Sequence, residues 1–136
     1  MLLKLLGLSI RTENGILARL AAQLPDTRWI VLMNSVGIPK RGYPDSVDAN
    51  HIAALSVALQ ALGERVLRDL RGGRLGYIVI GGELGLNMVI NLDRRFVLAL
   101  NLRPSSSLDA VLAALRQHAP PLLREAGLHL PENWLA

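Results

Sequence analysis

Alternating large apolar side chains predict two β-strands in the second half of the chain. These strands run from Leu86 to Leu92 and from Phe96 to Leu102, with the period of two that a pleated strand imposes. The link Asp93-Arg94-Arg95 is short enough to join antiparallel neighbours. A third strand, Leu75 to Ile80, precedes them across the glycine-rich turn Gly81 to Gly85. It is apolar without alternation, so we expect helices to cover both of its faces.

Apolar residues three and four apart predict a long helix from Asn50 to Arg71, with Asp48 as its N-cap. One stripe is expected to lie on the sheet: Ile52, Leu55, Leu59, Leu62, Val66 and Leu70. A second, adjacent face carries small side chains that would let another backbone come close: Ala54, Val57, Ala58 and Ala61. A monomer has no obvious use for this second face.

The first half of the chain predicts a helix followed by two strands. The helix is capped by Thr12 and runs to Leu24, with an apolar face made by Ile16, Leu17, Leu20 and Leu24. Trp29 to Met33 reads as a buried strand. After the turn Asn34 to Gly37, Ile38 to Gly42 reads as a short return strand whose Pro39 and two cations suit the edge of a sheet.

A third helix is predicted near the C-terminus. Ser106 and Asp109 have the spacing of a capping box, and the buried stripe is Leu108, Val111, Leu112 and Leu115. Pro120-Pro121 is expected to break or kink this helix, with a short amphipathic piece from Leu122 to Ala126 after it. We expect the tail, His129 to Ala136, to be poorly packed.

These elements predict an α+β fold in one domain, because 136 residues suffice for a single hydrophobic core. The order is helix, two strands, helix, three strands, helix, with one five-stranded antiparallel sheet and helices on both faces. The two strand groups must join, since an isolated hairpin is marginal in water. We divide the chain into an N-terminal extension (1–11), the main domain (12–119) and a C-terminal helix and tail (120–136).

Composition excludes several classes of function. The chain has no cysteine, so disulfides and thiolate metal sites are absent. Its net charge of +4 comes from cations scattered singly along the chain, without the basic stripe or interleaved aromatic residues of a nucleic-acid surface. Met1 to Ile10 lacks the features of a secretory signal, and no apolar run is long enough to span a membrane. We expect a cytoplasmic protein.

No catalytic, cofactor or metal site is predicted. The histidines His51, His118 and His129 are too far apart to share a metal ion. The pairs Gly72-Gly73 and Gly81-Gly82 lack the residues of a phosphate-binding loop and suit turns. The densest cationic run is Arg65, Arg68, Arg71 and Arg74. It either opposes the dipole at the end of the long helix or forms a surface for an acidic partner.

The overall pattern resembles the roadblock family, the dynein light-chain/roadblock domain of small-GTPase regulators. Trp29 to Pro39 is similar to the family's first strand, turn glycine and return strand. Ile52 to Leu70 resembles its alanine- and leucine-rich second helix, and Tyr77 to Leu102 its closing meander. The resemblance covers about Thr12 to Leu115 and implies a roadblock (profilin-like) α-ββ-α-βββ-α fold.

The resemblance implies a homodimer in which the second helices pack together and the third strands pair edge to edge. The implied interface is Ala54, Val57, Ala58, Ala61, Leu75, Tyr77, Ile78, Val79 and Ile80. Bacterial members of the MglB type bind a Ras-like GTPase and stimulate its hydrolysis by arranging the GTPase's own residues. A non-catalytic GTPase-activating or scaffolding partner is therefore the leading hypothesis, with Arg65, Arg68 and Arg71 as candidate partner contacts. A structural adaptor that leaves nucleotide turnover unchanged is the alternative, and a small-ligand sensor ranks last.

Overall fold

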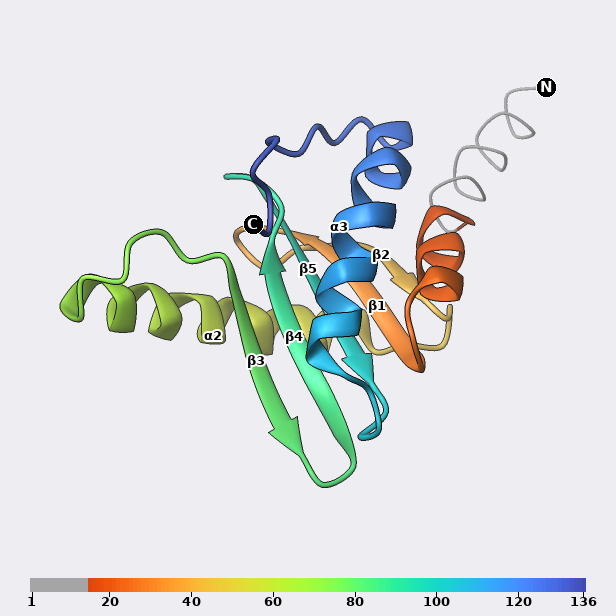
Figure 1. Ribbon diagram of the computed structural model, residues 1–136, viewed down its shortest axis with the longest axis horizontal. Helices are drawn as coiled ribbons and strands as arrows, with labels where there is room; N and C mark the ends of the chain where they lie inside the picture. Colours follow the sequence, from red (N-terminus) through yellow and green to blue (C-terminus); the bar gives the residue numbers. More distant parts are fainter. Residues whose placement is uncertain (1–14) are drawn as a thin grey trace.

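The computed structural model describes residues 15–136, and its elements follow the predicted order (Figure 1). A helical segment spans residues 15–23. It is followed by β1 (Thr27–Asn34), β2 (Pro39–Tyr43), α2 (Ala49–Asp69), β3 (Tyr77–Gly82), β4 (Gly85–Asn91), β5 (Phe96–Leu102) and α3 (Leu108–Glu125). The strands form one antiparallel sheet in the order β2-β1-β5-β4-β3. The predicted α+β fold is confirmed, whereas the cap Thr12 and the extension 1–11 lie outside the described residues.

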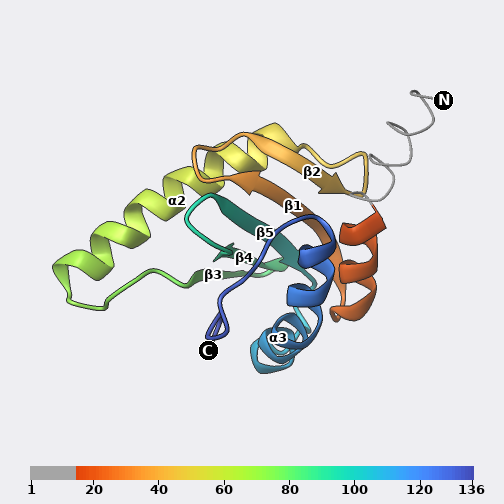
Figure 2. The same ribbon diagram turned by 90° about the horizontal axis from the view of Figure 1, so that it is seen from above.

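The sheet has helices on both faces, as predicted. Figure 2 shows α2 along one face, and the helical segment 15–23 with α3 along the other. Strand alternation divides the sheet between two apolar clusters. Leu98 and Leu100 of β5 face α3, whereas Val97 and Ala99 face α2.

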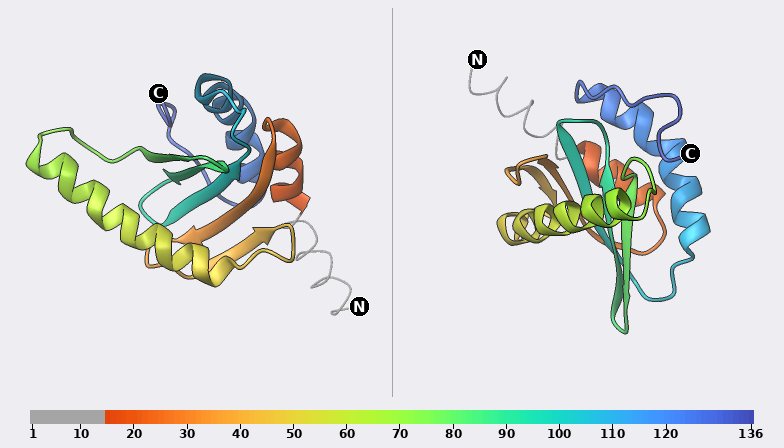
Figure 3. Two further views of the ribbon diagram at one scale, coloured as in Figure 1. Left: turned by 90° about the horizontal axis from the view of Figure 1, so that it is seen from below. Right: turned by 90° about the vertical axis from the view of Figure 1, so that its left-hand side faces the viewer.

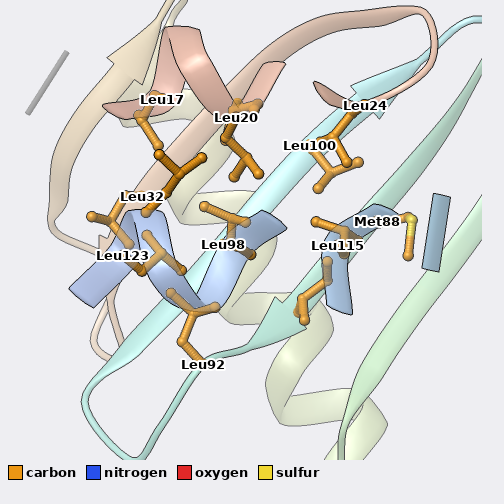
Figure 4. Packing of buried hydrophobic residues seen from close by; sticks show 14 of the residues in the cluster. Leu17, Leu20, Leu24, Leu32, Met88, Leu92, Leu98, Leu100, Leu115 and Leu123 are labelled. Carbon is orange, nitrogen blue, oxygen red and sulfur yellow. The ribbon is translucent and has the colours of Figure 1, made fainter. Parts of the chain in front are cut away.

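The larger cluster lies between the sheet and α3. Leu20, Leu98 and Leu115 come from three separate elements, and each is 0% exposed (Figure 4). Burying a leucine side chain of this kind stabilises the fold by roughly 1.5–3 kcal/mol. The predicted stripe of the first helix is thereby confirmed over its described residues.

The side of α2 that lies on the sheet differs from the prediction. Its buried residues are Ala53, Ser56 and Gln60, whereas four members of the predicted leucine-rich stripe are exposed: Leu55, Leu62, Val66 and Leu70. The assignment of the stripe to the sheet was wrong for these four residues, whereas its other two members, Ile52 and Leu59, do pack against the sheet. Small residues face the sheet because the helix sits close to it, as a Cβ added at Gly63 would lie 2.9 Å from Cδ1 of Ile78. Asp48 does cap α2, accepting from His51 N at 3.3 Å.

The C-terminal region is more regular than its prolines suggest. α3 is continuous through Pro120 and Pro121, so of the predicted break or kink the break is wrong, and the boundary drawn at residue 120 falls inside this helix. Packing of Ala119, Leu122 and Leu123 in the core holds the helix together across the two prolines. The helix cap is Ser107, which accepts from Ala110 N, and not the predicted Ser106.

The tail after α3 is packed against the sheet, contrary to expectation. Trp134 is 8% exposed and belongs to the larger cluster. Its Nε1 donates to the carbonyl oxygen of Asn91 at 2.8 Å. The indole can therefore be buried without leaving its N–H unpaired.

Candidate interaction surface

The outer face of α2 is the largest apolar feature exposed on a helix of the described chain. Leu62 is 62% exposed, Leu55 is 54% exposed and Val66 is 45% exposed. We define the outer α2 face as these three residues together with the exposed alanines: Ala54, Leu55, Ala58, Ala61, Leu62 and Val66. Large exposed apolar patches of soluble proteins are commonly interaction sites, so the outer α2 face is a candidate interaction surface.

The strand β3 supplies a second unpartnered feature. It lies at one end of the sheet order and pairs with β4, so within residues 15–136 the main-chain groups along its other side have no strand beside them. Tyr77 is 40% exposed and Ile80 is 43% exposed. The prediction that helices cover both faces of this strand is confirmed only in part, since Ile78 and Val79 are half-buried on opposite faces while Tyr77 and Ile80 are exposed. The edge lacks the charged residues and prolines that proteins use to block further strand pairing.

The outer α2 face and the β3 edge adjoin each other. The helix passes close to the start of β3, where a Cβ added at Gly63 would lie 2.9 Å from Cδ1 of Ile78 and 3.3 Å from Cδ2 of Leu75. Its C-terminal half then runs past β3 beyond the edge of the sheet (Figure 1). The right-hand view of Figure 3 shows α2 crossing the sheet with the β3–β4 hairpin extending below it. The helix face and the strand edge are thus open on the same side of the molecule.

The structure distributes the predicted interface residues between exposed and buried positions. Ala54, Ala58 and Ala61 are exposed on the outer α2 face. Val57 is half-buried, because its Cγ2 approaches Gly37 in the turn between β1 and β2.

On the strand side, Leu75 precedes β3 and is 8% exposed. Ile78 packs toward α2 and Val79 toward the α3 side, which leaves Tyr77 and Ile80 as the exposed side chains. Reasoning from sequence missed Leu55, Leu62 and Val66 as members of the exposed surface, since the same spacing also suits a stripe on the sheet.

The predicted partner contacts at the end of α2 are all exposed. Arg65 forms an ion pair with Asp69 at 3.5 Å. Arg68, Arg71 and Arg74 line one hollow of about 440 Å³ together with Glu64. The structure therefore separates Arg65 from the other two predicted arginines and brings Arg74 into their group.

The described residues offer no cluster of side chains suited to hold a metal ion. No group of three potential metal ligands occurs between residues 15 and 136, and His51 and His129 are exposed while His118 is half-buried. Gly81 and Gly82 end β3 and enter the hairpin turn to β4, so they do not open a helix as a phosphate-binding loop would. Among the described helices, none has the length and apolar character required to cross a membrane.

Solved structures with a similar fold come from several bacteria. Myxococcus xanthus MglB superposes with a TM-score of 0.71 at 15% identity, covering 84% of this chain and 93% of that one. MglB from Thermus thermophilus, a gliding protein, gives 0.71 at 17% identity, with coverage of 88% and 91%. A Roadblock/LC7 domain from Streptomyces avermitilis gives 0.66 at 23% identity, with coverage of 81% and 97%.

These identities establish a shared fold and no more. A search of curated proteins gave no significant match to the chain. The Roadblock/LC7 domain model matches residues 10–101, which is most of the chain and spans β1 through almost all of β5. The five-stranded sheet, the helices on its two faces and this sequence match agree, and the chain belongs to the Roadblock/LC7 domain family.

Proposed function

We propose that two copies of this chain associate through the outer α2 face and the β3 edge. The observation that supports this proposal is the continuity of an exposed apolar helix face with an unpaired, apolar strand edge. Pairing two β3 edges would continue the sheet and give the main-chain groups of both strands partners. A two-fold axis would place the same surface of each copy against its counterpart.

The homodimer, in this proposal, regulates a small Ras-like GTPase. Family membership and the similarity to MglB structures support this class of partner. In this proposal the dimer acts by binding the GTPase and arranging the catalytic residues of the GTPase itself. The arginines Arg68, Arg71 and Arg74 supply a cationic surface for an acidic region of the partner.

The direct test is GTP hydrolysis by a small GTPase encoded beside this protein, measured with and without it. Faster hydrolysis supports a GTPase-activating role. Binding of the GTPase without a change in rate would instead support an adaptor. The absence of any complex, measured by sedimentation or calorimetry in both nucleotide states, would exclude both functions for this pair.

The Leu62→Arg variant tests whether the dimer is the active form. A cation at Leu62 would place two like charges across the proposed interface, while the isolated chain already exposes that side chain. We expect the variant to keep its fold but to lose both dimerisation and the stimulation of GTP hydrolysis. Full stimulation by a monomeric variant would show that dimerisation is not required.

A further inference from the structure

A cleft of about 410 Å³ opens at the opposite end of the sheet from β3. It lies between the helical segment 15–23, the edge strand β2 and the end of α3. Its apolar floor is formed by Leu32, Leu123 and Leu128, which are at most 7% exposed, with the half-buried Phe96 beside them. Because the cleft lies away from the outer α2 face and the β3 edge, the proposed dimer would leave it open.

The charged residues that line this cleft are all cationic among those described. They are Lys40, Arg41 and Arg95. The nearest carboxylate to Arg95 is that of Asp93, at 4.0 Å, and its Oδ1 already accepts from the backbone N–H groups of Arg95 and Phe96. The side chain of Arg95 is 75% exposed, so this distant ion pair is screened by solvent.

Two carbonyl groups in the last turn of α3 are engaged in hydrogen bonds. The carbonyl oxygen of Leu123 accepts from Leu128 N at 3.0 Å, and that of Arg124 accepts from Gly127 N at 2.9 Å. These bonds close the helix with Gly127 in the left-handed region, at a φ of 84°. The cleft thus combines an apolar floor with a cationic rim.

We propose that this cleft binds an amphiphilic carboxylate, an acyl chain of medium length with a single anionic head. The head would lie at Lys40 and Arg95, and the chain would lie over the leucine floor. At about 30 Å³ for each small heavy-atom group, the cleft has room for roughly a dozen non-hydrogen atoms, the size of decanoate. This binding is independent of the GTPase and of dimerisation.

The test is a titration of the full chain, labelled with ¹⁵N, with sodium decanoate below the concentration at which micelles form. Saturable shifts are expected at the amides of residues 16–17, 40–41, 95–96 and 126–128. Decanol, which keeps the chain and lacks the charge, is expected to bind at least fivefold more weakly, because each exposed ion pair contributes only modestly. Equal binding of decanol would overturn the assignment of the rim to an anionic head.

Two double variants, each of which removes two positive charges, test whether decanoate binds at this cleft or responds only to the overall charge of the protein. Lys40→Ser/Arg95→Ser removes two cations from the rim and is expected to weaken decanoate binding about tenfold. Arg68→Ser/Arg71→Ser removes two cations at the far end of α2 and is expected to leave it unchanged. Equal losses in the two variants would overturn the site.

A third variant tests the cleft without removing a cation. Ala126 lines the cleft and is exposed, so Ala126→Glu adds a negative charge there without disturbing the core. It is expected to weaken decanoate binding severalfold. Binding to anionic vesicles that depends on Lys40 and Arg95, without saturable binding of free decanoate, would assign the rim to a membrane surface and overturn the proposal.

Discussion

Gly37 is held by two independent constraints in the turn between β1 and β2. Its φ is 93°, and an added Cβ would lie 2.8 Å from Cγ2 of Val57. Gly37→Ala is expected to lower the free energy of unfolding by about 2 kcal/mol, since a left-handed backbone alone costs an L-residue about 1–2 kcal/mol. Urea denaturation at fixed protein concentration measures the change. Gly76→Ala is the matched control, because a Cβ there meets nothing within 4 Å.

A second variant separates the contact from the backbone strain. In the Val57→Ala background the Cγ2 atom is absent, so Gly37→Ala should cost less than in the natural chain while the φ penalty remains. An effect of Gly37→Ala no larger than that of Gly76→Ala would contradict both constraints. The sequence predicted the turn at this glycine correctly. Its proximity to α2 could not be predicted, because it depends on how the helix packs against the turn.

Trp134 stabilises the tail through apolar burial and one hydrogen bond. Trp134→Phe keeps most of the ring in the core and leaves the carbonyl of Asn91 without its donor, so it should cost about 1 kcal/mol of unfolding free energy. Trp134→Ala removes the ring as well and should cost about 3–5 kcal/mol. Denaturation curves give both values. Small and equal effects of the two variants would mean that the tail is not part of the core in solution.

At the scale of elements, hydrophobic periodicity predicted correctly which segments form helices and strands. It predicted less well which face of each element is buried. Alternation located β4 and β5 because one residue in two must enter the α3-side core. In α2, the predicted leucine-rich and alanine-rich stripes run side by side and most of both is exposed, whereas the residues buried on the sheet are Ala53, Ser56 and Gln60. The sheet selects small residues such as Ala53 because the helix approaches closely. That preference depends on interaxial distance, which sequence spacing does not encode.

The exposed leucines of α2 yield a prediction at the same scale. Leu62→Arg is expected to raise the dimer dissociation constant at least a hundredfold, since a buried pair of like charges costs several kcal/mol at an interface. Analytical ultracentrifugation measures the constant. Leu108→Arg is the matched control at the start of α3, on the opposite face of the sheet, where 36% exposure already admits solvent. Equal effects of the two substitutions, or a natural chain that is monomeric at micromolar concentration, would contradict the proposed interface.

At the scale of the whole molecule, dimerisation links stability to concentration. If folded chains associate and unfolded chains do not, mass action adds to the stability of the folded state as protein concentration rises. A tenfold increase in concentration should therefore raise the thermal unfolding midpoint, whereas a monomer would unfold at a constant midpoint. Calorimetry over a hundredfold range of concentration makes this distinction, with Leu62→Arg as the variant expected to lose the dependence.

The mode of action on a GTPase is the last consequence at this scale. A regulator that inserts an arginine into the partner's site loses about a thousandfold or more of its stimulation when that arginine is removed. Arg68, Arg71 and Arg74 line a shared hollow beside Glu64, so neighbouring cations can compensate for the loss of any one. Single alanine substitutions at these arginines are therefore expected to lower stimulated hydrolysis only severalfold, mainly through weaker binding.

Single-turnover hydrolysis at saturating regulator separates binding from chemistry. Under that condition each single variant should approach the rate of the natural protein, because the partner's own residues perform the reaction once they are arranged. The triple alanine variant should instead need a much higher regulator concentration to reach the same rate of hydrolysis. Added salt should weaken GTPase binding by the natural protein more than GTPase binding by the triple variant. A thousandfold loss from one substitution at saturation would assign a catalytic arginine to this chain and replace arrangement of the GTPase by direct participation.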